Sequence, residues 1–207
     1  MANSDAPMGL RPIKHLDGSP YNGGGNPYFL ATGETNNIFI GDPVELAGSA
    51  NTASVTVPGF GTFPAGTLPT VKLATTGATH DLIGCAVSFS ADPTALQNQY
   101  RLASTARVVF VEDDPFVIYE IQEDSDGGSL AATDVGRNCD IIDNGSGSTI
   151  TGLSTWELDS GTAATGATLQ VRILRLVNRD DNAIGTNAKW EVLINSHQNL
   201  LNMAGVS

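Results

Sequence analysis

The chain has 207 residues, of which 41% are apolar and only 15% carry a charge, and its formal net charge is −12. This length and apolar content suffice for one domain with a core of its own. The low charge content and the 23 glycines favour an all-β chain with many turns over a helical enzyme. The negative balance argues against binding a nucleic-acid backbone, which requires a basic surface.

The first 27 residues contain too many helix and strand breakers for regular structure. The glycines at 23–25 give a flexible link, and each proline fixes its own φ and pushes the preceding residue into extended geometry. We therefore expect neither a helix nor a central strand here, and no share in a core. A disordered leader is one interpretation. An extended arm over residues 1–27 that orders on a partner is the other, and it is favoured by the single large apolar residues between the prolines: Met8, Leu10, Ile13, Leu16 and Tyr21.

The next part of the chain predicts short strands. The stretch 48–68 is rich in glycine and proline and indicates a long surface loop or an irregular hairpin. Its Phe60 and Phe63 either make contacts from the tip or anchor the loop locally. The acidic residues 112–115 join two strand-like runs and predict a hairpin. Runs of β-branched and aromatic residues place the strands at 28–31, 37–40, 44–47, 70–74, 82–89, 106–111 and 116–121.

The remaining part follows the same pattern. Residues 129–135 predict one or two helical turns, and strands are predicted at 138–142, 155–158, 169–177 and 189–195. The alternation breaks at Ile173 and Leu174, which indicates a bulge or a change from solvent to a partner. We expect ion pairs for three arginines of this region, Arg172, Arg175 and Arg179. The predicted fold class is all-β, a β-sandwich or barrel-like domain over residues 28–207 with an extended N-terminal arm and long loops.

Motifs of known enzymes are missing from the chain. It has no nucleophile elbow, no His-Glu-x-x-His, no phosphate-binding loop and no dinucleotide fingerprint. We therefore expect no catalytic residue, no cofactor and no metal. None of the histidines pairs locally with a carboxylate or a cysteine, and a structural role is expected for each of them: His15, His80 and His197.

Two further features have mainly structural interpretations. The stretch from Asp124 to Gly128 begins like a calcium loop but has no third ligand and no closing glutamate, so solvated acidic turns are the preferred explanation. Cys85 and Cys139 lie in apolar runs and are expected to be buried free thiols. No run has the length for a membrane span, and the first residues lack the pattern of a signal peptide.

Five sequence blocks occur in order along the chain: Ala2-Asn3-Ser4-Asp5-Ala6-Pro7 with Gly9-Leu10-Arg11-Pro12, His15-Leu16 with Gly18 and Pro20-Tyr21-Asn22-Gly23, Phe39-Ile40-Gly41-Asp42-Pro43-Val44, Asp113-Asp114-Pro115 with residues 116–122, and Asp180-Asp181-Asn182 with residues 189–195. This ordered set resembles virion structural proteins of tailed bacteriophages, and within them the capsid cement, or decoration, proteins. The runs 23–25 and 48–68 depart from the pattern.

The resemblance implies a structural virion protein rather than an enzyme, made in the host cytoplasm and placed on the capsid exterior. It would bind the outer surface of an icosahedral head and bridge major capsid subunits. The partners implied are the major capsid protein and further copies of the chain, with a trimer favoured over a dimer, and neither nucleic acid nor membrane. The expected capsid contacts are Pro7, Leu10, Arg11, Pro12, Ile13, Tyr21 and Tyr28, with Leu10, Ile13 and Tyr21 as apolar anchors and Arg11 paired to a capsid carboxylate.

Two other classes of function remain open. A glycan-binding or adhesion module of the β-sandwich type requires an exposed aromatic platform, for which Trp156, Trp190, Phe60 and Phe63 are the candidates, although tryptophans in strand-like runs usually pack in a core. An enzyme, the least favoured class, requires a cleft with two close carboxylates. If the arm interpretation holds, deletion of residues 1–27 leaves a folded protein that no longer binds capsids.

Overall fold

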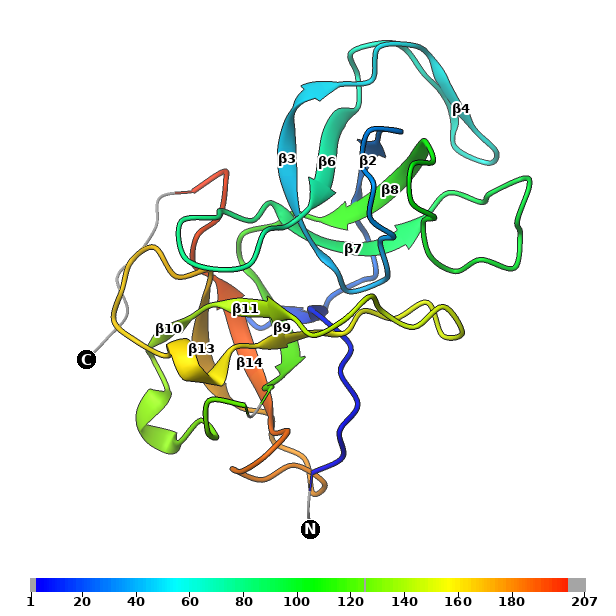
Figure 1. Cartoon of the computed structure of the whole chain (residues 1–207). Coiled ribbons are helices and arrows are strands. Elements are labelled where there is room, and N and C mark those ends of the chain that lie inside the picture. Colours follow the sequence, from blue (N-terminus) through cyan, green and yellow to red (C-terminus); the bar gives the residue numbers. More distant parts are fainter. Residues whose placement is uncertain (1–2, 125, 201–207) are drawn as a thin grey trace.

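The computed structural model of the chain describes residues 3–124 and 126–200. Within these residues, strands form all the regular structure except two single-turn 3-10 helices, η1 (Ala132–Asp134) and η2 (Ser160–Thr162). The chain is all-β with a barrel above a second sheet (Figure 1), which confirms the predicted fold class. No helix of the described part is both long and apolar enough to cross a membrane.

The barrel consists of five short strands. All neighbouring strands are antiparallel except one pair, which runs parallel and meets at Phe29 and Thr70. Buried apolar side chains fill the interior, among them Leu30, Val44 and Val109. The strands, in their order round the closed barrel, are β2 (Asn26–Leu30), β6 (Pro69–Leu73), β3 (Pro43–Ala50), β7 (Gly84–Phe89) and β8 (Arg107–Glu112).

The second sheet is antiparallel and has, in order, β1 (Arg11–His15), β9 (Val117–Gln122), β14 (Lys189–Ile194), β13 (Val171–Leu176) and β10 (Asn138–Cys139). The central strand β14 is buried along its whole length. Its charged residues are tolerated because they have partners: Glu191 forms ion pairs of 2.9 Å with Lys14 and with Arg175. β13 shifts register between Ile173 and Arg175, so the predicted bulge is confirmed.

The predicted hairpin across residues 112–115 is wrong. β8 pairs with β2 and β7 in the barrel, whereas β9 pairs with β1 and β14 in the other sheet. The acidic segment is therefore a crossover between the two sheets. Its bend is held by partners distant in sequence, since Asp113 accepts hydrogen bonds from Asn26 and Tyr28 at 2.7 and 2.6 Å.

The loops of the barrel partly follow the expectations. Residues 48–68 form an irregular hairpin with β4 (Val55–Val57) and β5 (Gly61–Phe63) at its end. Each of the two phenylalanines takes one of the two predicted roles, local anchor or exposed contact. Phe63 packs against the small apolar cluster beneath the hairpin, whereas Phe60 is 64% exposed and lies 4.8 Å from the ring of Phe110. Residues 37–40 form isolated bridges rather than the predicted strand.

The largest core cluster lies where the barrel meets the sheet. It combines Leu82 and Cys85 from the barrel side with Trp156 and Trp190 from the sheet side. Trp156 belongs to a two-stranded ribbon of β11 (Ile141–Asp143) and β12 (Trp156–Leu158). Both tryptophans are buried and both cysteines are buried free thiols, as expected.

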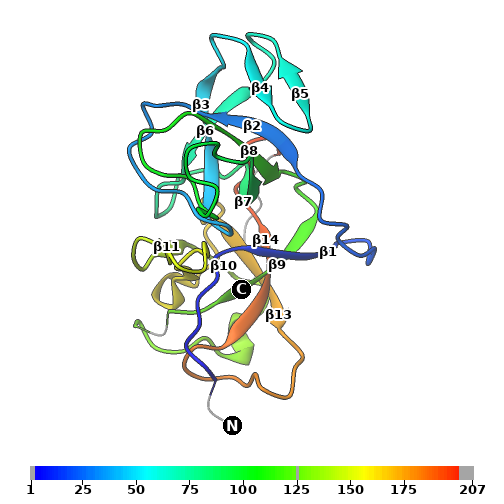
Figure 2. The same cartoon turned by 90° about the vertical axis from the view of Figure 1, so that its right-hand side faces the viewer.

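The N-terminal segment is extended, as predicted, but it is part of the fold. β1 lies between the barrel and the rest of the sheet and crosses the molecule in Figure 2. Leu10 is fully buried in the large core cluster. The expectation that residues 1–27 have no share in a core is therefore wrong. The segment contains neither a helix nor a central strand, as expected, but it does form an edge strand, because strand β9 supplies hydrogen-bond partners that offset the effect of Pro12. The prediction that the chain folds without this segment loses its basis.

Candidate partner-binding groove

Two glycines bring the N-terminal segment against the body of the protein. Leu10 donates its backbone N–H to the carbonyl of Gly41 at 2.8 Å, and Gly41 in turn donates to the carbonyl of Ala86 at 2.8 Å. Gly9 and Gly41 have φ angles of +67° and +94°, and a Cβ on Gly41 would overlap the carbonyl oxygen of Met8. Only glycine fits a position that combines this conformation with such a close approach.

A groove of about 570 Å³ lies between this segment and the body, and its lining is mainly apolar. Ile40 and Leu153 form part of its wall, where Ile40 accepts the Ser154 N–H and donates to the Gly152 carbonyl, both at 2.9 Å. Leu153 is 40% exposed. The N-terminal segment contributes Pro7, Met8, Leu10, Arg11, Pro12 and Tyr21, and the body contributes Ile40, Ala86, Val87 and Leu153.

The structure gathers five of the seven predicted contact residues at this groove: Pro7, Leu10, Arg11, Pro12 and Tyr21. Ile13 is half-buried in β1 and Tyr28 lies in β2, and neither lines the groove. Two expectations need correction. Leu10 is 0% exposed and belongs to its own chain's core, so it does not serve as an anchor that inserts into a partner. Tyr28 is 7% exposed, and its hydroxyl donates to Asp113.

Arg11 differs from the other basic residues of the chain. The sequence has ten lysines and arginines, and each of the others has an ion pair or a hydrogen bond within the chain. Arg11 is exposed and has no such partner among the described residues. None of the described residues that line the groove is acidic. The groove therefore offers an apolar surface with one available guanidinium group, which suits an extended apolar segment that carries a carboxylate.

The sequence did not indicate the wall that the body supplies. Val87 and Leu153 are far from the N-terminus in sequence, and only the folded chain brings them beside Pro7 and Pro12. Ile40 had one signal, because it lies in the block 39–44 that carries the phage resemblance.

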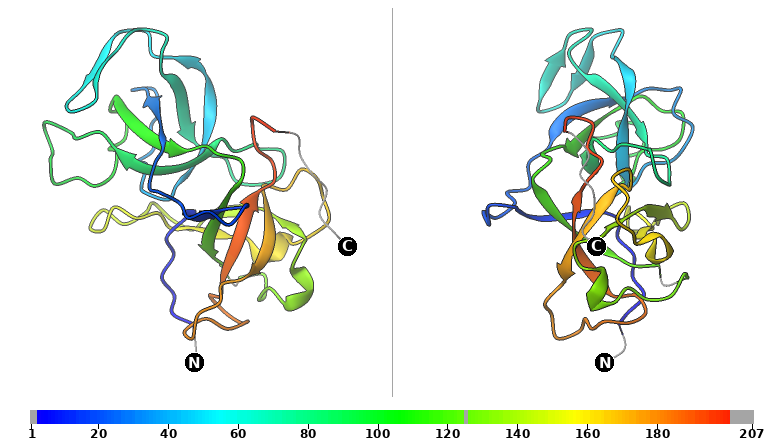
Figure 3. Two further views of the ribbon diagram at one scale, coloured as in Figure 1. Left: turned by 180° about the vertical axis from the view of Figure 1, so that it is seen from behind. Right: turned by 90° about the vertical axis from the view of Figure 1, so that its left-hand side faces the viewer.

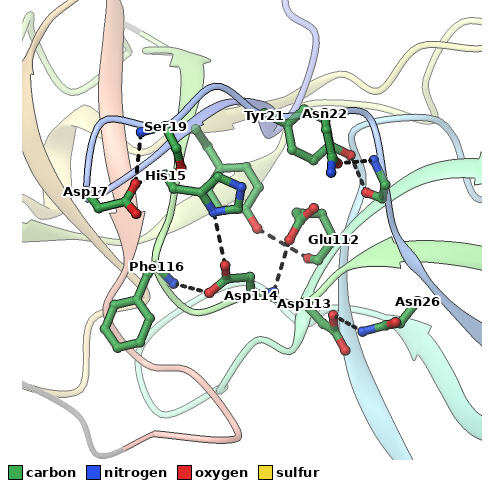
Figure 4. A network of polar contacts seen from close by, with 12 residues as sticks. His15, Asp17, Ser19, Tyr21, Asn22, Asn26, Glu112, Asp113, Asp114 and Phe116 are labelled. Atoms are coloured by element: carbon green, nitrogen blue, oxygen red, sulfur yellow. Dashed lines mark hydrogen bonds and ion pairs between the residues drawn. The ribbon is translucent and has the colours of Figure 1, made fainter.

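A polar network fixes the far end of β1 (Figure 4). His15 Nδ1 lies 3.0 Å from Asp114 Oδ2, a pairing across the fold that local sequence spacing could not indicate. Asp114 also accepts the Phe116 N–H at 2.9 Å and donates its own N–H to Glu112 at 3.1 Å. Burial raises the pKa of Glu112. The crossover and the end of β1 are thus held as one unit.

The acidic turn that begins at Asp124 brings the carboxylates of Asp124 and Asp126 close to a third carboxylate from another part of the chain. Carboxylate oxygens of Asp124, Asp126 and Asp159 all lie within 4.8 Å of one another. Asp159 comes from a distant segment, so the sequence did not indicate it. The hydrogen bond with Asp124 raises the pKa of Asp126, so a proton is retained there more readily than on a free aspartate.

Comparison with known proteins gives no match to a family model, to a curated protein or to a solved structure. The aromatic platform required by the glycan-binding alternative loses two of its candidates, because Trp156 and Trp190 are 2% and 0% exposed. Phe60 is the exposed member of that set.

Proposed function

We propose that the chain is a structural virion protein, a capsid cement subunit that binds the outer surface of an icosahedral phage head and bridges major capsid subunits. The observation that carries the proposal is the apolar groove beside Arg11, the basic residue with no partner in the described chain. The groove also gathers residues from three of the blocks that resemble phage virion proteins, 2–12, 15–23 and 39–44.

The residues that form the groove are held in fixed positions, which favours the binding of a partner segment. Leu10 anchors the N-terminal segment in the core, and the bond from Leu10 to Gly41 fixes it against the body. Little conformational entropy is then lost when a partner segment enters, so more of the contact free energy appears as affinity. Arg11 would pair with a carboxylate of that segment and set its register.

The proposal includes self-association and placement on the capsid exterior. Repeated modest contacts from several copies act together, so avidity strengthens attachment to a shell. Closed symmetry, with a trimer as the first expectation and a dimer as the second, would present several grooves to the shell at once.

The test is co-sedimentation of the purified chain with expanded empty heads of its phage, with sedimentation equilibrium of the free protein to give its mass. Saturable binding that protects heads against heat is expected. Arg11→Gln should weaken binding by about tenfold and Arg11→Glu by more, because the partner carboxylate is left unpaired.

Arg175→Gln is the matched control, because Arg175 is exposed but already paired with Glu191. It should leave binding unchanged. Absence of binding by the wild-type chain would overturn the cement proposal, and equal binding by the Arg11 variants would remove the groove from it.

A further inference from the structure

A second exposed apolar surface lies at the opposite end of β1 from Arg11. The turn after His15 projects from the body, as the blue loop at the right of Figure 2 shows. Leu16 and Phe116 are 51% and 53% exposed and lie side by side, because the Leu16 N–H donates to the Phe116 carbonyl at 2.7 Å. We call this the tip surface. It surrounds a hollow of about 500 Å³ and consists of His15, Leu16, Asp17, Ser19, Asp114 and Phe116.

The tip surface is held in place from both sides. Asp17 Oδ1 accepts the backbone N–H and the hydroxyl of Ser19 at 2.8 and 2.7 Å, which closes the turn (Figure 4). On the other side, Asp114 pairs with His15 and accepts the Phe116 N–H. The two apolar side chains are therefore presented to solvent by a fixed backbone. Such pre-organisation lowers the cost of binding and makes an exposed apolar pair effective as a contact.

The charges of the tip surface are opposite to those of the groove. Two carboxylates, Asp17 and Asp114, line it, and Asp17 Oδ2 accepts no hydrogen bond from the described residues. The hydrogen bonds from Ser19 lower the pKa of Asp17, so this group stays charged in mildly acidic solution. His15 is the one basic side chain of the surface within the described part, and it is engaged by Asp114. Charge complementarity therefore calls for an occupant with a cation.

The chain itself has little to offer as that cation. Every lysine and arginine except Arg11 has a partner within the fold, and Arg11 lines the groove. A second copy would have to break one of these contacts or leave its groove empty. The cation is better supplied by a different protein.

We propose that the tip surface is a second docking site, which takes an apolar segment of the shell protein that carries a lysine or an arginine. The cation faces Asp17 and Asp114, and the apolar side chains of the segment cover Leu16 and Phe116. This inference rests on the proposed cement function and adds to it how one subunit contacts the shell. The groove and the tip surface, at the two ends of one short strand, take segments of opposite charge, so one subunit spans two different regions of the shell.

The experiment compares variants of the full chain in the co-sedimentation assay with expanded empty heads. Leu16→Ser combined with Phe116→Ser is expected to weaken binding by about tenfold or more, because the apolar contact is lost. Asp17→Asn keeps an oxygen that accepts the Ser19 bonds but removes the charge. It is expected to weaken binding by about threefold to tenfold and to reduce its dependence on salt.

Matched controls lie on the loop that follows β13. Ile184→Ser changes an apolar residue that is 52% exposed, and Asp180→Asn changes an exposed aspartate. Both should bind like the wild type.

Each outcome decides something. If the tip variants bind like the wild type while Arg11→Glu loses binding, the tip inference is overturned and the cement proposal stands. If the wild-type chain does not bind heads, both are overturned. If the tip variants lower the sedimentation mass of the free protein without changing shell binding, the occupant is a second copy and the shell assignment is wrong.

Discussion

Asp42 is a carboxylic acid enclosed by the chain next to the groove. It is 2% exposed, and its Oδ2 accepts the Phe39 N–H at 2.8 Å. Burial raises the pKa of Asp42 to about 7, an effect that its hydrogen bonds from Ser154 and Phe39 only partly offset. The folded protein thus holds this proton more tightly than the unfolded chain, where an aspartate titrates near about 3.9. Its contribution to stability is complete below that pH and is lost as the pH rises through about 7.

Asp42→Asn should therefore flatten the pH dependence of folding. Asparagine keeps the oxygen that accepts the Phe39 N–H and cannot ionise. We expect the wild type to lose about 2–4 kcal/mol more unfolding free energy than this variant between pH 4 and pH 8. Urea titrations at several pH values measure the difference, and the exposed Asp180→Asn is the control. Parallel curves for Asp42→Asn and wild type would show that Asp42 is not the buried acid responsible.

Strand β1 shows how a segment whose sequence predicts irregular structure becomes part of a sheet. Pro12 lacks the N–H of a regular strand residue, and the register with β9 shifts between Pro12 and Lys14. The strand forms despite Pro12 because it lies at the edge of the sheet and because Leu10, just before it, is fully buried. Edge positions tolerate proline where central ones do not.

Two leucines of the same segment test this role. Leu10→Ala should cost about 2–5 kcal/mol of unfolding free energy, because it leaves a cavity in the core. Leu16→Ala, at a residue that is 51% exposed, should cost less than about 0.5 kcal/mol. Urea denaturation followed by tryptophan fluorescence gives both values. Equal and small costs would mean that the N-terminal segment is not anchored as described, and the arm interpretation would regain its force.

The sequence predicts elements better than their partners, for a physical reason. Runs such as 82–89 and 116–121 contain the β-branched and aromatic residues that form strands, and both coincide with observed strands. Strand pairing depends on contacts between distant residues, so nothing local distinguishes a hairpin at 112–115 from a crossover. The groove shows the same limit. Five residues of its N-terminal side were named in advance as contact residues, but not as part of a groove, and its wall of Val87 and Leu153 exists only after folding.

At the scale of the whole molecule, barrel and sheet share one core. Cys85 of β7 and Trp190 of β14 belong to the same buried cluster. After β14 the chain returns to the barrel, in red in Figure 3, where Gln198 accepts the Leu46 N–H at 2.7 Å. The barrel interior also has an apolar cluster of its own, but the largest cluster is common to both parts, and we treat them as one cooperative unit.

Unfolding should accordingly occur in a single transition. Trp156 and Trp190 both report on the sheet side of the shared core, whereas far-ultraviolet circular dichroism reports on all strands. The two signals are expected to coincide along a denaturant titration, because loss of the shared cluster destabilises both parts together. A circular-dichroism change that begins before or after the fluorescence change would mean that barrel and sheet unfold separately.

The division of strands between barrel and sheet also determines the order in which the strands can pair during translation. Every barrel strand lies between Asn26 and Glu112, so the barrel is fully synthesised while much of the sheet is still missing. β1 is made first but has to wait for β9, and the sheet is complete only when β14 emerges. The segment that contains β1 thus stays unpaired until the barrel strands and β9 have been synthesised. Its prolines, which weaken β pairing with other chains, protect it during that interval.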